Sequence, residues 1–222
     1  AAMLMPALSK ARETSRRAVC ANNQRQLFVF EALYADDADG LALLGYVNTN
    51  HQSQYFIRIN TLEFVSAGRL YGAGYINESS ADVYFCPSQR NDYGSRWGSL
   101  NTWPPTGTGF TRASWGWRTE GPGNVDWGSA TGAQAAAALR SSPKLDALAN
   151  LAFFSDLTHH NASLNYHFNA GANVTNGDGS TIWIPLSSFS TVYYGLPANG
   201  DPFTAATNGQ MDAVWLTFDA QR

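Results

Sequence analysis

Charged side chains are scarce in this chain. Asp, Glu, Lys and Arg make up 14% of its 222 residues, against roughly 25% in an average soluble domain. The formal net charge is −3, so the chain lacks the basic field that neutralises phosphates, and we expect no nucleic-acid partner. No apolar run reaches the roughly 20 residues that a membrane-spanning helix requires. Amides, hydroxyls and aromatic rings replace the missing charge, which is common outside the cell.

Cysteine is also scarce. The chain has only Cys20 and Cys86, without the paired short spacings of a zinc site or a Cys-x-x-Cys redox motif. They are therefore either two buried free thiols or one disulfide. A composition poor in Lys and Glu and rich in Asn, Thr and Trp favours the disulfide, and with it an oxidising compartment. Such a bond would close a long loop and stabilise the fold by about 3–4 kcal/mol.

Recognisable catalytic motifs are absent from the sequence. There is no Gly-x-Ser-x-Gly elbow, phosphate-binding loop or dinucleotide fingerprint. The densest group of titratable residues contains Asp156, His159, His160, His167 and Asp178. Adjacent histidines on a strand point to opposite faces and serve poorly as a metal pair, and an active or metal site here would need a nucleophile or a third ligand nearby. We therefore expect loop histidines and a turn aspartate, with no catalysis.

The basic residues gather at the N-terminus. Residues 1–31 hold five basic and two acidic side chains, whereas the rest of the chain holds nine basic and fifteen acidic ones. Spacings of three and four residues predict one long helix over residues 3–35, which ends before Gly40. Its expected apolar face consists of Leu4, Leu8, Ala11, Ser15, Ala18, Val19 and Cys20, continued by Leu27, Phe30, Leu33 and Tyr34. The remaining positions include Lys10, Arg12, Glu13, Arg16 and Arg17.

Short apolar runs separated by Gly, Asn, Ser and Pro follow this helix. They predict strands at residues 55–59, 83–85, 151–155, 172–175, 181–185 and 214–218, and helices at residues 61–67 and 129–139. The Gly177-Asp178-Gly179 segment predicts a hairpin turn. Residues 87–132 are rich in Gly, Pro and aromatics and predict a long ordered loop. The expected fold class is α+β, with a long N-terminal helix packed on an antiparallel β-sheet.

Several segments together resemble one known family. They are residues 4–13 after an apolar start, residues 16–27 with their Cys-Ala-Asn-Asn-Gln-Arg-Gln run, residues 34–40, the Cys-Pro-Ser of residues 83–88, and His167 followed by Asn173 and Asp178-Gly179. This combination resembles the type II secretion pseudopilin-like proteins, a type IV pilin-like group of planctomycetes, verrucomicrobia and their relatives. In that group the pattern of His167, Asn173, Asp178 and Gly179 is a C-terminal signature.

The resemblance implies a fold, a role and a location. It implies a pilin-like helix over residues 1–40, whose membrane-anchoring part lies upstream, and an α+β head over residues 41–222 with a long aromatic-rich insertion. The implied role is a non-enzymatic subunit of a type II secretion or type IV pilus-like filament. The implied partners are other pilin-like subunits, bound through the helix, and the inner-membrane assembly machinery. The head would be periplasmic or extracellular, on a protein anchored in the inner membrane.

Two ligand-binding alternatives remain open. Asp36, Asp37 and Asp39 offer the hard oxygen ligands that calcium prefers, although solvated carboxylates at a helix end explain them equally well. No other cofactor is expected. Trp97, Trp103, Trp115, Trp117 and Trp127 could form a platform for sugar rings or could pin the long loop. The alternative function is therefore a surface-anchored carbohydrate-binding module on a pilin-like stalk.

Overall fold

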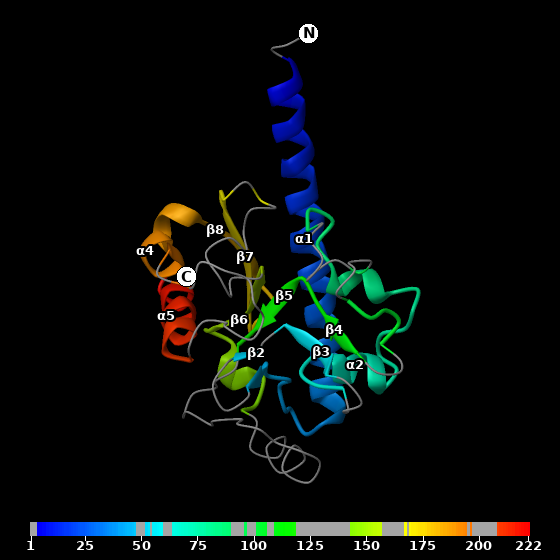
Figure 1. The fold of residues 1–222 in the computed structure, drawn as a ribbon. Coiled ribbons are helices and arrows are strands. Elements are labelled where there is room, and N and C mark those ends of the chain that lie inside the picture. Colours follow the sequence, from blue (N-terminus) through cyan, green and yellow to red (C-terminus); the bar gives the residue numbers. More distant parts are fainter. Residues whose placement is uncertain are drawn as a thin grey trace.

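The computed structural model has an α+β architecture. It describes residues 4–47, 52–53, 55–59, 64–89, 96, 101–105, 109–118, 143–156, 167, 169–194, 196 and 208–222. The longest element is the 34-residue helix α1 (Leu4–Asp37), whose first turns project beyond the other labelled elements (Figure 1). The predicted N-terminal helix is therefore confirmed. Among the described residues, no helix combines the length and the apolar character needed to cross a bilayer.

The buried stripe of α1 differs from the predicted apolar face. The buried residues are Glu13, Cys20, Gln24, Leu27, Glu31 and Ala35. Six residues of the predicted face are exposed instead, namely Leu8, Ala11, Ser15, Ala18, Val19 and Leu33. The prediction was wrong because three of the six buried positions carry polar side chains, whose burial depends on hydrogen-bond partners elsewhere in the chain.

The main sheet has four antiparallel strands in the order β5-β6-β7-β8. They are β5 (Trp115–Trp117), β6 (Ala152–Asp156), β7 (Gly171–Asn176) and β8 (Thr181–Pro185). Strands β6, β7 and β8 confirm three of the predicted strands, and β7 and β8 pair as the predicted hairpin. Strand β5 lies in the region predicted as a long loop.

The sheet lies between two helical layers (Figure 1). Helix α1 contacts β7 and β8, and Cys20 and Leu27 of α1 share one apolar cluster with Trp115, Trp117 and Phe153. Ala172, Val174 and Ile184 pack in a second apolar cluster with Phe189, Tyr193, Val214, Trp215 and Phe218. Helices α4 (Ser190–Tyr194) and α5 (Asn208–Asp219) contribute to this second layer. The successive residues of β7 therefore face α1 and α5 alternately.

Two predicted strands are helical in the structure. Residues 81–84 form the 3-10 helix η1 (Ala81–Tyr84), and residues 214–218 lie within α5. In α5, Val214, Trp215 and Phe218 are buried whereas Leu216 is exposed, which is the spacing of a helix face. A five-residue apolar run does not by itself distinguish a buried strand from a helix. Both strand predictions were therefore wrong.

The remaining described elements are short. Strands β1 (Tyr46–Val47) and β2 (Gln52–Ser53) form one two-stranded sheet, and β3 (Phe56–Ile59) pairs with β4 (Phe110–Arg112) in another. Helix α2 (Gly68–Gly72) begins after the helix predicted over residues 61–67, of which residues 61–63 lie outside the described part. The 3-10 helices η2 (Asp146–Leu148) and η4 (Leu186–Ser188) complete the fold. The helix predicted over residues 129–139 lies outside the described residues.

Candidate functional site

Buried polar side chains gather where α1 meets the main sheet. We call this group the buried polar cluster, and its members are Glu13, Gln24, Ser88, Asp156, His167, Asn173 and Thr175. Each of them is at most 7% exposed. Glu13 and Gln24 come from α1, Asp156 from β6, and Asn173 and Thr175 from β7. The cluster therefore joins the N-terminal helix to two central strands.

His167 lies between two carboxylates in this cluster. Its Nδ1 is 2.6 Å from Glu13 Oε1, and its Nε2 is 3.3 Å from Asp156 Oδ2. Ser88 donates a hydrogen bond to the same Glu13 oxygen at 2.8 Å. The side chain of His167 is fully buried. Because a carboxylate faces each ring nitrogen, the site holds the imidazole in one orientation.

The pKa of His167 is raised above its usual value. Burial alone lowers this pKa, because it penalises the charged imidazolium. The negative charges and hydrogen bonds of Asp156 and Glu13 act in the opposite direction and outweigh the burial. The cluster therefore favours an imidazolium held between two carboxylates.

Asp156 receives hydrogen bonds from both the sheet and the helix. Its Oδ2 accepts from the backbone N–H of Asn173 at 2.6 Å and from the Asn173 side-chain amide at 3.1 Å. Its Oδ1 accepts from Gln24 Nε2 at 3.2 Å. Gln24 Oε1 in turn accepts from the Thr175 hydroxyl at 2.9 Å. A buried carboxylate is stable only with such partners, so this network couples the position of α1 to that of β7.

A pocket opens beside the cluster. It has a volume of about 430 Å³ and is lined by Pro6, Ser9, Lys10, Glu13, Thr14, Arg17, His167 and Ala170. The Arg17 guanidinium lies 3.4 Å from the centre of the Trp183 ring, a cation–π contact. Burial lowers the pKa of Arg17, whereas the charges of Glu13 and Asp156 raise it, and the net shift is downward. The pocket thus lies beside His167 and is lined by the basic residues Lys10 and Arg17 as well as by Glu13.

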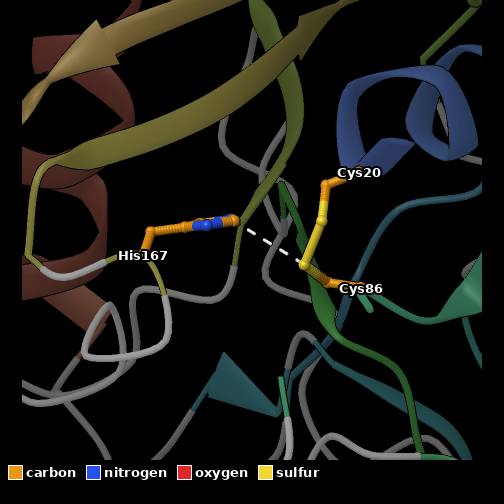
Figure 2. Close-up of side chains that lie close together, drawn as sticks. All are labelled: Cys20, Cys86 and His167. Carbon is orange, nitrogen blue, oxygen red and sulfur yellow. Dashed lines mark hydrogen bonds between the residues drawn. A yellow bond between two sulfur atoms is a disulfide. The ribbon is translucent and has the colours of Figure 1, made fainter. Parts of the chain in front are cut away.

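The disulfide contacts the cluster directly. Cys20 on α1 is bonded to Cys86, which follows η1, with their Cα atoms 5.1 Å apart, so the structure contains the expected bond. Cys86 Sγ lies 3.8 Å from His167 Nε2, and Figure 2 shows the imidazole edge facing this sulfur. The ligand atoms of Cys20, Cys86 and His167 lie within 4.8 Å of one another. Within the described residues, this is the one group of three or more His, Cys, Asp or Glu side chains that converges in this way.

The four signature residues do not form a single site. His167 and Asn173 belong to the buried polar cluster. Asp178 and Gly179 lie in the β7–β8 turn, where Asp178 Oδ1 accepts hydrogen bonds from the N–H and hydroxyl of Ser180. Gly179 has a positive φ of 83°. Asp178 therefore shapes a turn, as expected, and is not a member of the buried polar cluster that contains His167.

The three tryptophans of the proposed sugar platform that the structure describes do not form one exposed surface. Trp115 and Trp117 on β5 are 0% exposed, so neither ring can stack on a ligand. Their indole N–H groups bond Val83 O and Glu31 Oε1. Trp103 is half-buried against Tyr71 and Phe85, as part of an aromatic group that includes the Arg96 guanidinium. Trp97 and Trp127 lie outside the described residues.

The acidic residues at the end of α1 remain at the surface. Asp36, Asp37 and Asp39 are exposed, and Asp37 accepts a hydrogen bond from the Tyr75 hydroxyl. They do not belong to the converging ligand group in the part of the chain that the structure describes. This geometry adds no support to the calcium alternative. His159 and His160 lie outside the described residues.

Of the cluster residues that the sequence analysis missed, Glu13 and Gln24 lie on α1. Both were hidden by their polarity, since a polar side chain on a helix is normally assigned to the solvent face. Their spacing carried a usable signal: Glu13, Cys20, Gln24 and Leu27 are seven, four and three residues apart and share one helix face. Because Cys20 was expected to bond the head, its whole face was a candidate for burial.

The polar groups of the cluster are bonded mainly to one another. Its carboxylates, amides and imidazole bond one another, and its hydroxyls bond Glu13 and Gln24. It can hold a proton between two carboxylates and can resist separation of the helix from the sheet. Comparisons of the chain with protein-family models, with curated proteins and with solved structures find no match.

Proposed function

We propose that this chain is a non-enzymatic, pseudopilin-like subunit of a type II secretion or type IV pilus-like filament, and that α1 is its assembly surface. The observation that carries the proposal is an exposed apolar stripe on α1. Met5, Leu8, Val19, Val29 and Leu33 are between 48% and 76% exposed. A long helix that is covered on one side by a head and carries exposed apolar side chains on the other is suited to packing against copies of itself.

The positions of these five residues follow the helix geometry. At about 100° per residue, they fall within an arc of about 120° whose centre lies about 140° from that of the buried stripe. Polar residues such as Arg12 and Gln26 share this arc and are exposed. The outer face of α1 thus carries both apolar and polar side chains. This composition is expected of a contact surface that is exposed to water until the subunits assemble.

Covalent and hydrogen bonds attach the head to α1, as a filament subunit under tension would require. The Cys20–Cys86 disulfide holds the helix covalently, and the buried polar cluster holds it through Glu13 and Gln24. In addition, Asn23 donates side-chain hydrogen bonds to the carbonyls of Asp82 and Phe85. A force applied to the projecting helix would therefore pass into the sheet.

The disulfide supports the location that we propose. A disulfide fits an oxidising compartment, and the proposed subunit is held at the inner membrane by an apolar segment ahead of residue 1. The proposed partners are neighbouring pilin-like subunits and the inner-membrane assembly machinery. The upstream coding sequence tests this part directly: we expect a prepilin-type cleavage junction followed by a continuous apolar stretch.

The assembly surface is tested by charge substitution on α1. In cells that produce the full-length protein, Val19→Glu and Leu33→Glu should remove the cross-linked ladder of subunits seen with wild type. Thr14→Glu is the matched control, because Thr14 is exposed on the same helix but outside the apolar arc. Equal ladders from all three variants, or no ladder from wild type, would overturn the proposal.

A further inference from the structure

We propose that Cys20, Cys86 and His167 form a buried binding site for a thiophilic divalent cation, Zn²⁺, when the disulfide is reduced. Thiolate sulfur and imidazole nitrogen are the preferred ligands of zinc. The three side chains are at most 2% exposed, and their ligand atoms lie within 4.8 Å of one another. This inference concerns the site alone and does not depend on the proposed filament role.

The distances around His167 match those of a tetrahedral zinc site. With Zn–S bonds of about 2.3 Å and Zn–N bonds of about 2.0–2.1 Å, a sulfur and a nitrogen ligand lie about 3.6 Å apart. In the structure, Cys86 Sγ is 3.8 Å from His167 Nε2. Figure 2 shows Nε2 directed at the Cys86 end of the sulfur pair. The imidazole is therefore already in position, and the change required is that the two sulfurs move to about 3.8 Å apart.

Asp156 lies next to the nitrogen ligand but outside the converging group of Cys20, Cys86 and His167. Oxygen and nitrogen ligands of one tetrahedral zinc ion are about 3.3 Å apart, and Asp156 Oδ2 is 3.3 Å from His167 Nε2. The same oxygen keeps its hydrogen bonds from Asn173, which would orient the carboxylate. The structure thus assigns a site of two sulfurs and one nitrogen, with the Asp156 carboxylate beside the nitrogen.

A second layer of contacts supports the imidazole. Zinc-bound histidines commonly donate their other ring N–H to a carboxylate, which fixes the tautomer and the ring orientation. Here Nδ1 faces Glu13 Oε1 at 2.6 Å, and Ser88 donates to that same oxygen. The pocket of about 430 Å³ is lined by both Glu13 and His167, so it lies against this side of the site.

Formation of the site requires a two-electron reduction. A dithiol reductant attacks the Cys20–Cys86 bond and is oxidised to its cyclic disulfide. Cys20 and Cys86 become thiols and take up the two protons that the dithiol gives up. Zn²⁺ then displaces those two protons and the proton on His167 Nε2. Two thiolates neutralise the charge of the ion, which reduces the cost of burying it. The disulfide and the metal therefore exclude each other, and the site responds to redox state.

Zinc titration of the oxidised and reduced chain tests the proposal. The chain is reduced with a phosphine, which does not chelate zinc as a dithiol does, and Zn²⁺ is titrated against a chromophoric chelator. We expect one equivalent to bind the reduced chain and none to bind the oxidised chain. Equal zinc binding in both states would overturn the proposal.

Variants and spectroscopy separate this site from adventitious thiol binding. His167→Ala should weaken zinc binding by more than Glu13→Gln, for which a loss of about 10- to 100-fold is expected. Glu78→Gln, at an exposed position remote from the cluster, is the matched control and should leave affinity unchanged. X-ray absorption of the wild-type zinc complex should show two sulfurs and an imidazole. A sulfur-only or fully oxygen-ligated shell would overturn the proposal.

Reduction of the disulfide could unfold the chain, and near-ultraviolet circular dichroism detects this through the aromatic signal. If the reduced chain loses its aromatic signal, Zn²⁺ should restore it, because a metal that binds the folded state stabilises that state. Failure of Zn²⁺ to restore the signal would show that the ions bind an unfolded chain and would overturn the proposal.

Discussion

Glu31 is an acidic side chain held in an apolar environment. It is 1% exposed on the buried stripe of α1, and Trp117 donates its indole N–H to Glu31 Oε1 at 3.2 Å. Burial raises the pKa of Glu31 from 4.5 to about 8, although the Trp117 hydrogen bond acts in the opposite direction. Between these two values the folded chain retains a proton that the unfolded chain releases.

This retained proton makes stability fall as pH rises. From about pH 5 to about pH 8, Glu31 should lower the free energy of unfolding by at most about 1.4 kcal/mol per pH unit. His167, whose pKa is also raised, contributes with the same sign. In Glu31→Gln the contribution of Glu31 to this pH dependence should vanish. Urea unfolding should therefore show that the variant gains stability relative to wild type as pH rises from 5.5 to 8.5. The exposed control Asp36→Asn should follow wild type. Parallel pH profiles of Glu31→Gln and wild type would contradict the assignment.

Asp156 is the most heavily bonded carboxylate of the buried polar cluster. Asp156→Ala removes the oxygens that accept from the side-chain amide of Gln24 and from Asn173, and that face His167 Nε2. Breaking a buried charge pair from one side typically costs about 3–5 kcal/mol. We expect a loss of that order in denaturant unfolding, and a change below about 1 kcal/mol for the exposed control Asp146→Ala. A similar effect of both substitutions would show that the cluster does not stabilise the fold.

At the scale of elements, the β7–β8 hairpin depends on its turn. Gly179 has a φ of 83°, and a β-carbon there would lie 2.7 Å from Phe28 Cδ1 on α1. The turn therefore requires glycine for its backbone conformation and for close packing of the hairpin against the helix. Asp178 completes the turn by accepting from Ser180, so Asp178 and Gly179 serve the joint between hairpin and helix.

The two requirements on Gly179 can be separated. Gly74 has a φ of 85°, but a β-carbon there would meet nothing within 4 Å. Gly74→Ala should therefore show the backbone cost alone, about 1–2 kcal/mol. Gly179→Ala should cost about 1–3 kcal/mol more, because the new methyl group displaces Phe28. Thermal or urea unfolding measures both, and equal losses would show that the contact with α1 relaxes freely.

At the scale of the whole molecule, the exposed stripe of α1 sets the expected association behaviour. The chain of residues 1–222 offers five apolar side chains spread from Met5 to Leu33, and the proposed filament contact also includes an apolar segment ahead of residue 1. We therefore expect sedimentation to show a monomer, or a weak equilibrium that depends on concentration. A tight oligomer of defined size would contradict the proposal that the filament contact needs the apolar segment ahead of residue 1 as well as α1.

The sequence by itself determined the features that depend on short-range physics. Three- and four-residue spacing specified a helix that occupies Leu4–Asp37, and Gly177-Asp178-Gly179 specified the hairpin turn. Composition favoured the Cys20–Cys86 bond that the structure contains. Each of these follows from neighbouring residues or from the small number of available partners.

Only the tertiary structure decided which face of α1 is buried and what meets there. Glu13 and His167 are 154 residues apart, and Gln24 and Asp156 are 132 apart. No local pattern marks such pairs, because a polar side chain becomes favourable inside a protein only when distant groups complete its hydrogen bonds. For the same reason residues 214–218 read as a strand and fold as a helix: the sheet and α4 present the surface that their helical face covers.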